Sequence, residues 1–318
     1  MRPGALIAGL AGLALVAALL LDRGAGAVWS ALSALGWSGF ALLVAAHLAA
    51  IVPCAIALRC LIEAPAPGLG RILWVRLCRD AAGDLLGFVP AIGDLLAMRA
   101  LRLLGLAGSA AAAIAVVDLT IELIAQVAFS AVGLALLAAL AGGSAPYYGA
   151  AGLVLMAAAM AGFVAVQRAG ACGLIERLAR RFAHGAGAAV ERHLALLWRD
   201  RPRIVRSFAI HFVAWFVGVA EAWIALHLMG IEAGLATVLA IESAVFALRT
   251  AAFVVPGALG IQEGAYVVLA ALFGLPGEAM LAVSLAKRGR EIALGVPILV
   301  SWQIVEGRRA AAAGGTSA

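Results

Sequence analysis

Acidic and basic side chains lie deep inside apolar stretches of this 318-residue sequence. The apolar run 109–140 carries Asp118, Glu122 and Gln126 at four-residue spacing, which places all three on one face of a helix. A second set lies inside the last apolar run, at Lys287, Arg288 and Glu291. Charge in such surroundings is costly and marks a candidate binding site or proton path. A polar stripe that only joins neighbouring helices is the alternative.

Two proline–glycine breaks interrupt apolar stretches, and an acid follows each of them. The second break and the polar residues after it are Pro256, Gly257, Gly260, Gln262 and Glu263. The first break, three residues shorter between proline and acid, has Pro90, Gly93 and Asp94. Proline removes a backbone donor and glycine accepts turn conformations, so both breaks are expected to end helices at membrane depth. Such backbone is tolerated where protein buries it or a wet cavity adjoins it, and the next helix can turn its positive end toward an anion. A simple kink with a snorkelling carboxylate is the alternative for the second break.

The segment 70–108 around the first break is rich in charge for a membrane segment. Arg76 and Asp80 are four residues apart and could pair on one helix face. Other charges near the two breaks are Arg79, Asp84, Arg99 and Arg249. We expect two half-length helices around each break, which form re-entrant hairpins over 70–108 and 233–274. An amphipathic hairpin on the cytoplasmic face is the alternative for the first.

The composition excludes an ordinary soluble domain. The chain is 65% hydrophobic and 13% charged, with a mean hydropathy of +1.08, and this predicts an all-α polytopic transmembrane helical bundle. Besides the two hairpins we expect about six full spans, at 4–21, 37–58, 109–140, 147–166, 207–229 and 278–305. The four cysteines show no metal-ligand spacing, so no metal and no cofactor is expected. A small-residue stretch at 25–27 leaves a cleaved signal peptide as an alternative for the first span.

The segment 167–206 is the one long polar stretch, with nine arginines against three acids. An excess of arginine is typical of cytoplasmic loops, so we expect this loop inside the cell. Binding of lipid headgroups by the loop is the alternative reading of its charge. Arg308 and Arg309 predict a cytoplasmic C-terminus on the same grounds.

The two breaks indicate an internal repeat, because adding 169 to positions after the first break reproduces the pattern after the second. The related pairs are Asp94 and Glu263, Asp118 and Lys287, and Glu122 and Glu291. We expect a first membrane repeat at 1–141, a second at 142–309 and a disordered tail at 310–318. The expected topology gives the repeats opposite orientations, an arrangement typical of secondary transporters. Asp118 and Lys287 would then pair across a shared polar cavity.

These motifs resemble the lysylphosphatidylglycerol synthase transmembrane (flippase-domain) superfamily. Its pattern of Pro-Gly-x-x-Gly-x-x-Glu, a Gly-Leu-Pro-type turn and a later basic residue reads here as Pro256–Gly257, Gly260, Glu263, Gly274–Leu275–Pro276 and Lys287–Arg288. Its earlier proline, glycine–acid and arginine match Pro90, Gly93–Asp94 and Arg99. With the stretch 117–122, the chain is most similar to the hopanoid-biosynthesis-associated integral membrane proteins. The chain stops at Ala318, before the soluble aminoacyl transferase domain of the synthases, so synthase activity is not implied.

The resemblance implies a transporter or flippase of the bacterial inner membrane, for a hopanoid or a related polar lipid. The candidate substrate-binding residues are Arg79, Asp84, Asp94, Arg99, Asp118, Glu122, Arg249, Gln262, Glu263, Lys287, Arg288 and Glu291. A membrane lipid is the expected partner, with lipid-biosynthesis proteins as further candidates and no nucleic acid. A non-catalytic scaffold and an intramembrane lipid-modifying enzyme are the alternatives. The sequence lacks the HExxH and GxSxG motifs, so we expect no enzyme.

The expected topology can be tested by cysteine labelling in a background without the native cysteines. A cysteine at Ser144 should react with a periplasmic reagent, whereas cysteines at Ser207 and Ser317 should not. The reverse pattern would overturn both the orientation and the inverted repeat.

Overall fold

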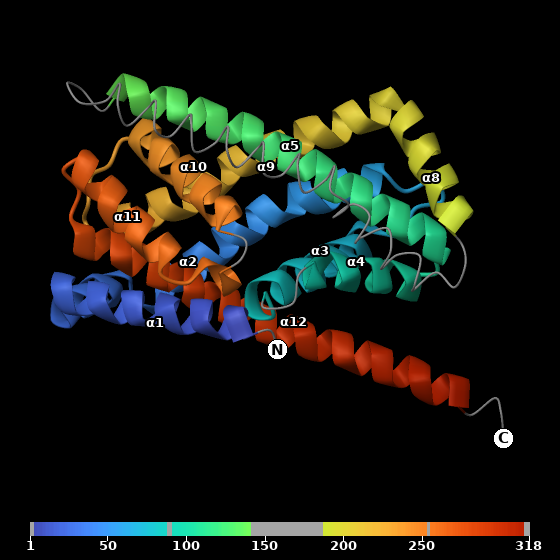
Figure 1. The fold of residues 1–318 in the computed structure, drawn as a ribbon, viewed down its shortest axis with the longest axis horizontal. Helices are drawn as coiled ribbons and strands as arrows, with labels where there is room; N and C mark the ends of the chain where they lie inside the picture. Colours follow the sequence, from blue (N-terminus) through green and yellow to red (C-terminus); the bar gives the residue numbers. More distant parts are fainter. Residues whose placement is uncertain (1–2, 88–90, 141–186, 253–254, 315–318) are drawn as a thin grey trace. The chain divides into compact units, whose positions relative to one another are not determined.

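The computed structural model describes residues 3–87, 91–140, 187–252 and 255–314, and every regular element in these ranges is a helix. The predicted all-α class is therefore confirmed for them (Figure 1). The elements are α1 (Pro3–Arg23), α2 (Ala25–Cys60), α3 (Leu69–Leu85), α4 (Ile92–Leu103), α5 (Gly108–Leu140), α8 (Gly187–Arg199), α9 (Arg201–Leu228), α10 (Leu235–Ala251), the 3-10 turn η1 (Pro256–Ala258), α11 (Ile261–Leu272) and α12 (Gly277–Gly314). The predicted span 147–166, Pro90 and the first part of the basic loop lie outside the described residues.

Three of these helices, α2, α5 and α9, are long and apolar enough to cross a membrane. Their membrane-spanning character agrees with the predicted class, and the count of six full spans stays a prediction. Within α2, Gly36 leaves the helical conformation at φ 63°, so the helix is divided where the sequence predicted a span to begin. A residue other than glycine would be strained at that angle.

Two helices extend beyond the spans predicted for them. Helix α9 begins at Arg201, before the predicted span at 207–229, and the long arginine side chains at its start can remain solvated there. Helix α12 continues past the predicted span at 278–305 to Gly314. The disorder predicted for the tail stays a prediction. Alanine has the highest helix propensity, and the stretch 310–313 consists of four alanines.

Both predicted breaks separate two short helices, and the two helix pairs have matching lengths. Helices α3 and α10 have 17 residues each, and α4 and α11 have 12 each. Figure 1 shows α3 beside α4 and α10 beside α11, and each pair packs together. That these hairpins re-enter a membrane stays a prediction.

The helices after the breaks begin in the same way. The residue before α4 is Ala91, at φ 59°, and the residue before α11 is Gly260, at φ 79°. Both therefore have a positive φ, which glycine accepts without the steric cost that alanine meets. The third helical residue is an acid in each case, Asp94 or Glu263, and a negative charge in the first turn stabilises a helix.

The chain folds into two compact units. Among the described residues, the first collects 3–50, 122–140, 211–252 and 255–290, and the second collects 51–87, 91–121, 187–210 and 291–314. Each unit thus takes segments from both halves of the sequence and cuts across the predicted boundary at residues 141 and 142. The division into two repeats is a statement about sequence equivalence and stays a prediction.

The core of the first unit is built on aromatic contacts between α5, α9 and α10. Phe129 stacks on Trp215 with ring centroids 5.7 Å apart and meets Phe216 edge-on at 5.2 Å. Trp215 in turn meets Phe246 edge-on at 4.9 Å. Such pairs add stabilisation beyond that of their buried area. Fully buried aliphatic side chains around them are Leu43, Leu226, Ile241 and Met280.

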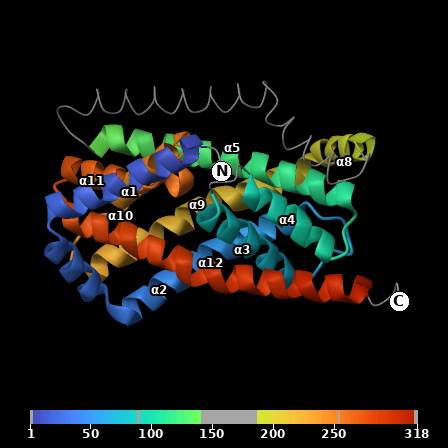
Figure 2. The same ribbon diagram turned by 60° about the horizontal axis from the view of Figure 1, so that its bottom comes forward.

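The second unit packs α3 and α4 against the start of α5 and the end of α12. Its buried aliphatic residues include Ile72, Leu101, Val117 and Ile121. The Trp74 indole N–H donates to the Ser301 hydroxyl at 2.9 Å. The Arg99 guanidinium donates from Nε to Glu306 Oε1 at 3.0 Å. Figure 2 shows α3 and α4 next to this part of α12.

Glycines let backbone approach both breaks closely. A Cβ added to Gly12 of α1 would lie 2.5 Å from the Leu259 carbonyl oxygen, just after η1. In the second unit, a Cβ added to Gly93 of α4 would lie 2.5 Å from the Arg79 carbonyl oxygen of α3. These distances are below van der Waals contact, so any side chain at either position would push the elements apart.

The burial of Ser207 changes the topology test. Its side chain is fully buried, so a cysteine there would be slow to label on either side of a membrane. Arg192 on α8 is exposed and lies in the same basic segment. We expect Arg192→Cys to resist the periplasmic reagent but to react after the membrane is permeabilised, and labelling from outside would contradict the predicted orientation.

Candidate functional site

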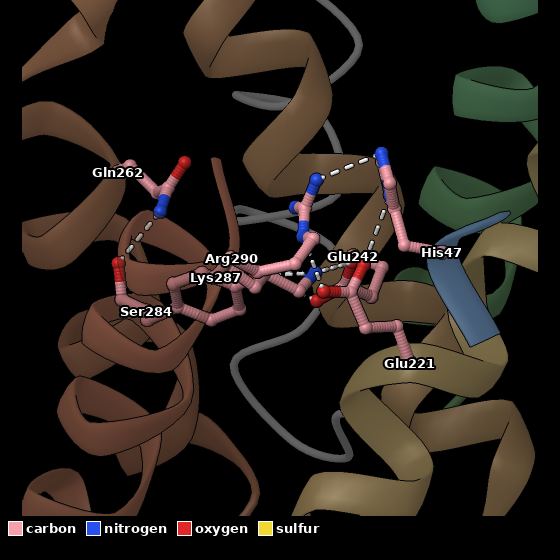
Figure 3. A network of polar contacts seen from close by, with 8 residues as sticks. His47, Glu221, Glu242, Gln262, Ser284, Lys287 and Arg290 are labelled. Carbon is pink, nitrogen blue, oxygen red and sulfur yellow. Dashed lines mark hydrogen bonds and ion pairs between the residues drawn. The ribbon is translucent and has the colours of Figure 1, made fainter. Parts of the chain in front are cut away.

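A lysine and a glutamate form a buried ion pair in the first unit. Lys287 Nζ of α12 lies 2.5 Å from Glu242 Oε2 of α10 and donates to the Tyr266 hydroxyl at 2.9 Å. The Tyr266 hydroxyl also donates to Glu242 Oε1. Figure 3 shows Lys287 and Glu242 meeting between their helices. Lys287 is 3% exposed and Glu242 is 0% exposed, so the pair has little access to water.

Aromatic rings complete the environment of Lys287. Its ammonium lies 5.7 Å from the centroid of the Phe246 ring and 5.6 Å from that of Tyr266. Ring faces attract cations at this range. Removing one member of such a buried ion pair costs about 3–5 kcal/mol, because the other charge is left without compensation. The stability of Lys287, Glu242 and Tyr266 in the core therefore depends on all three being present.

A second cluster of charge lies one helical turn further along α12. Arg290 Nε donates to Glu221 Oε1 of α9 at 2.8 Å. Arg290 Nη1 lies 2.9 Å from His47 Nε2 of α2, and His47 Nδ1 lies 3.5 Å from Glu221 Oε2 (Figure 3). Arg290 and Glu221 are buried, and His47 is the more accessible member.

Glu263 connects the second break to α12. Its Oε2 accepts the backbone N–H of Gly260 at 2.8 Å, which caps the start of α11. Its Oε1 accepts the Ser284 hydroxyl at 3.1 Å and Arg288 Nε at 3.2 Å. Ser284 also accepts the amide of Gln262 at 2.7 Å (Figure 3). Glu263 is 1% exposed, and its two bonds to Ser284 and Arg288 join the break to α12.

The second unit has a buried network of its own. Arg76 donates to Asp80 at 3.0 Å, which confirms the predicted pairing on one helix face. Arg79 Nε donates to Asp94 Oδ1 at 2.7 Å, across the first break. Both arginines also lie 3.9 Å from Asp118 Oδ2 of α5. Asp118 is 2% exposed, so its charge is buried. The two arginines beside it compensate that charge.

The two buried networks use equivalent positions with opposite charges. Arg76 lies 14 residues before Pro90, and Glu242 lies 14 residues before Pro256. Their partners, Asp118 and Lys287, each follow the acid after the break by 24 residues. Arginine pairs with aspartate in one unit, and glutamate pairs with lysine in the other. Positions at equal sequence distances from the two breaks therefore carry an ion pair in both units, with the sign reversed.

The structure corrects the predicted partners of two site residues. Asp118 has Arg76 and Arg79 beside it, and Lys287 has Glu242. The sequence predicted a direct pair between Asp118 and Lys287 because their charges are opposite. Each of them instead has its counter-charge within its own unit. Arg79, Asp94 and Asp118 come together, and so do Gln262, Glu263 and Arg288. The other predicted residues are partly buried or buried on their helices: Asp84, Glu122, Arg249 and Glu291; Arg99 pairs with Glu306.

Sequence reasoning left several network residues out of the candidate site. These are His47, Arg76, Glu221, Glu242, Tyr266, Ser284 and Arg290. Glu242 could have been found from the predicted repeat. The first break is three residues shorter, so the offset before the breaks is 166, and Arg76 then falls on Glu242. No comparable signal identifies His47 or Tyr266, since their partners lie far away in sequence.

Comparison with protein families places these networks in a known context. A family model described as the lysylphosphatidylglycerol synthase TM region matches residues 5–298, a range that contains both breaks and both networks. The chain belongs to this family. Membership in the lysylphosphatidylglycerol synthase TM-region family confirms the predicted superfamily and a lipid-related membrane protein, whereas the hopanoid subgroup stays a prediction. Comparisons with curated proteins and with solved structures found no match.

The ion pair of the first unit generates a test of the corrected partners. Lys287→Met should strand Glu242 and lower folded yield and melting temperature in detergent, since an unpaired buried charge costs about 3–5 kcal/mol. The double variant Lys287→Met, Glu242→Gln should recover most of that stability. Size-exclusion chromatography and thermal melting measure both quantities.

The matched control combines Lys287→Met with Asp118→Asn. This double variant should be no more stable than Lys287→Met alone, because Asp118 has its own arginine neighbours. If stability recovers in this control and not in the Glu242 double variant, Lys287 pairs with Asp118, as the sequence suggested.

Proposed function

We propose that this chain moves a polar lipid between the two leaflets of a membrane. The observation that supports this most directly is the sign-reversed buried ion pair at equivalent positions behind two helix breaks. Buried charges are costly in a membrane segment and are retained where a polar substrate or a proton has to pass. Membership in a lipid-related membrane family agrees with a lipid as the substrate.

We further propose that the two halves of the chain are inverted repeats. In support, α3 and α10 have the same length and the same distance from the proline of their break, and α4 and α11 have equal lengths. Helices α5 and α12 also begin 169 residues apart, at Gly108 and Gly277. Opposite orientation of the repeats follows from the predicted cytoplasmic location of the basic segment 167–206. Repeats of this kind allow a central site to face each side of the membrane in turn.

The break in the first unit offers groups suited to a lipid headgroup. Gln262 is 1% exposed, and its Oε1 has no hydrogen-bond donor among the residues that the structure describes. A buried acceptor without a donor is unfavourable, so a hydroxyl or ammonium group of a headgroup would stabilise it. Arg288, with a 15% exposed side chain, could offer its guanidinium to an anionic group beside it. The apolar tail of the lipid would stay in the bilayer.

For the substrate we propose a hopanoid or a related polar lipid, and for the location the bacterial inner membrane with a cytoplasmic C-terminus. The support for the substrate is the resemblance of the stretch 117–122, the second break and Lys287–Arg288 to the hopanoid-associated proteins. Lipid composition of the inner and outer membranes in a deletion strain would test this. A lipid that accumulates in one membrane identifies the substrate, whereas unchanged membranes contradict transport in the cell.

The transport proposal can be tested with purified protein in liposomes that contain fluorescent polar lipids. Glu263→Gln should slow movement between leaflets by about tenfold or more, because a charge-assisted bond to Arg288 and the cap on α11 are both weakened. Quenching of the outer-leaflet dye measures the rate.

The matched control is Glu232→Gln, which neutralises an exposed acid in the same unit. It should leave the rate unchanged. Chemical alteration of the lipid would instead indicate an enzyme, and neither movement nor alteration by the unmodified protein would leave the scaffold as the better explanation.

A further inference from the structure

A cavity of about 510 Å³ lies in the second unit, away from the breaks in sequence. It is lined by the end of α2, the loop that follows it and the start of α9. Arg59, Arg203 and Arg206 line it with a single acid, Asp200. The volume falls in the range of small-ligand sites. The lining therefore has an excess of two positive charges.

The hydrogen bonds of the arginines show which charges are available. Arg203 Nε pairs with Asp200 Oδ2 at 3.1 Å, so these two charges neutralise each other. Arg59 Nε donates to the Pro67 carbonyl oxygen at 3.0 Å, a neutral group that orients the guanidinium and leaves its charge uncompensated. Arg206 has no acidic partner among the described residues. Arg59 and Arg206 thus bring two positive charges to the cavity.

The position of the cavity fits the boundary between a membrane and water. It lies where α2 ends and α9 begins, and both helices are candidate membrane spans. Ile56, one turn before Arg59, also lines the cavity and is 37% exposed. A site with apolar surface on the side of the spans and guanidinium groups beyond them matches the order of acyl chain and headgroup in a lipid.

We propose that this cavity binds a phosphate group, held by Arg59 and Arg206. Guanidinium groups bind phosphate oxygens through paired, charge-assisted hydrogen bonds, and two of them can neutralise a phosphodiester or monoester. The phosphate could belong to an anionic phospholipid or to a soluble anion. This site is separate from the breaks and does not depend on the transport proposal.

Binding can be measured on the full chain in a neutral detergent by native mass spectrometry. The probes are short-chain phosphatidylglycerol, glycerol phosphate and inorganic phosphate, with uncharged short-chain diacylglycerol as the reference. Arg206→Gln and Arg59→Gln should each weaken binding of at least one phosphate probe by about tenfold or more. The matched control is Arg201→Gln, which removes an exposed arginine from the same helix end but not from the cavity.

The probes separate the two sources of phosphate. Binding of phosphatidylglycerol alone, with loss in Arg206→Gln and Arg59→Gln, supports a lipid headgroup site. Equal binding of glycerol phosphate or inorganic phosphate, with the same losses, supports a site for a soluble anion. Equal weakening in Arg201→Gln, or no weakening in either cavity variant while their melting temperatures are unchanged, overturns the proposal.

Discussion

Lys287 and Glu242 form an ion pair in a part of the protein that water scarcely reaches. The packing of the helices that carry them depends on this pair. An ion pair buried in this way is little more stabilising than an apolar pair of the same shape, but either charge alone would be strongly destabilising. Tyr266 makes one further hydrogen bond with each partner. Helices α10, α11 and α12 must therefore stay in register, because each contributes one of the three groups.

The second unit also compensates a buried charge, with different residues. Asp118 replaces the lysine, Arg76 replaces the glutamate, and Arg79 adds a second cation that is shared with Asp94. Five groups rather than three take part, because Arg76 also donates to Asp80, and the acid after the break takes part directly. Only the location of the charges relative to the breaks is common to the units. Position is thus preserved where residue type is not, as expected if the fold requires a compensated polar layer rather than a particular side chain.

Sequence reasoning predicted the helices and breaks well, because both depend on local properties. Apolar runs give the spans, and Pro256 with Gly257 and Gly260 gives the second break. The pairing of Arg76 with Asp80 was also predictable, since helix geometry fixes which side chains are neighbours at that spacing. Contacts such as Lys287 to Glu242 connect different helices, and their choice depends on how the helices pack. Local periodicity carries no information on that packing, so Asp118 and Lys287 were assigned to each other.

The length of the short helices determines how far the charge on the following helix lies from the break. Twelve helical residues in α4 or α11 rise by about 18 Å, and the ten residues from Gly108 to Asp118, or from Gly277 to Lys287, rise by about 15 Å. A chain that leaves a break along one helix and returns along the next therefore brings its charge back close to the level of the break. The contact between Glu263 and Arg288 agrees with this. The short helix acts as a spacer. One added turn, about 5.4 Å, would move the charge away from the level of the helix break.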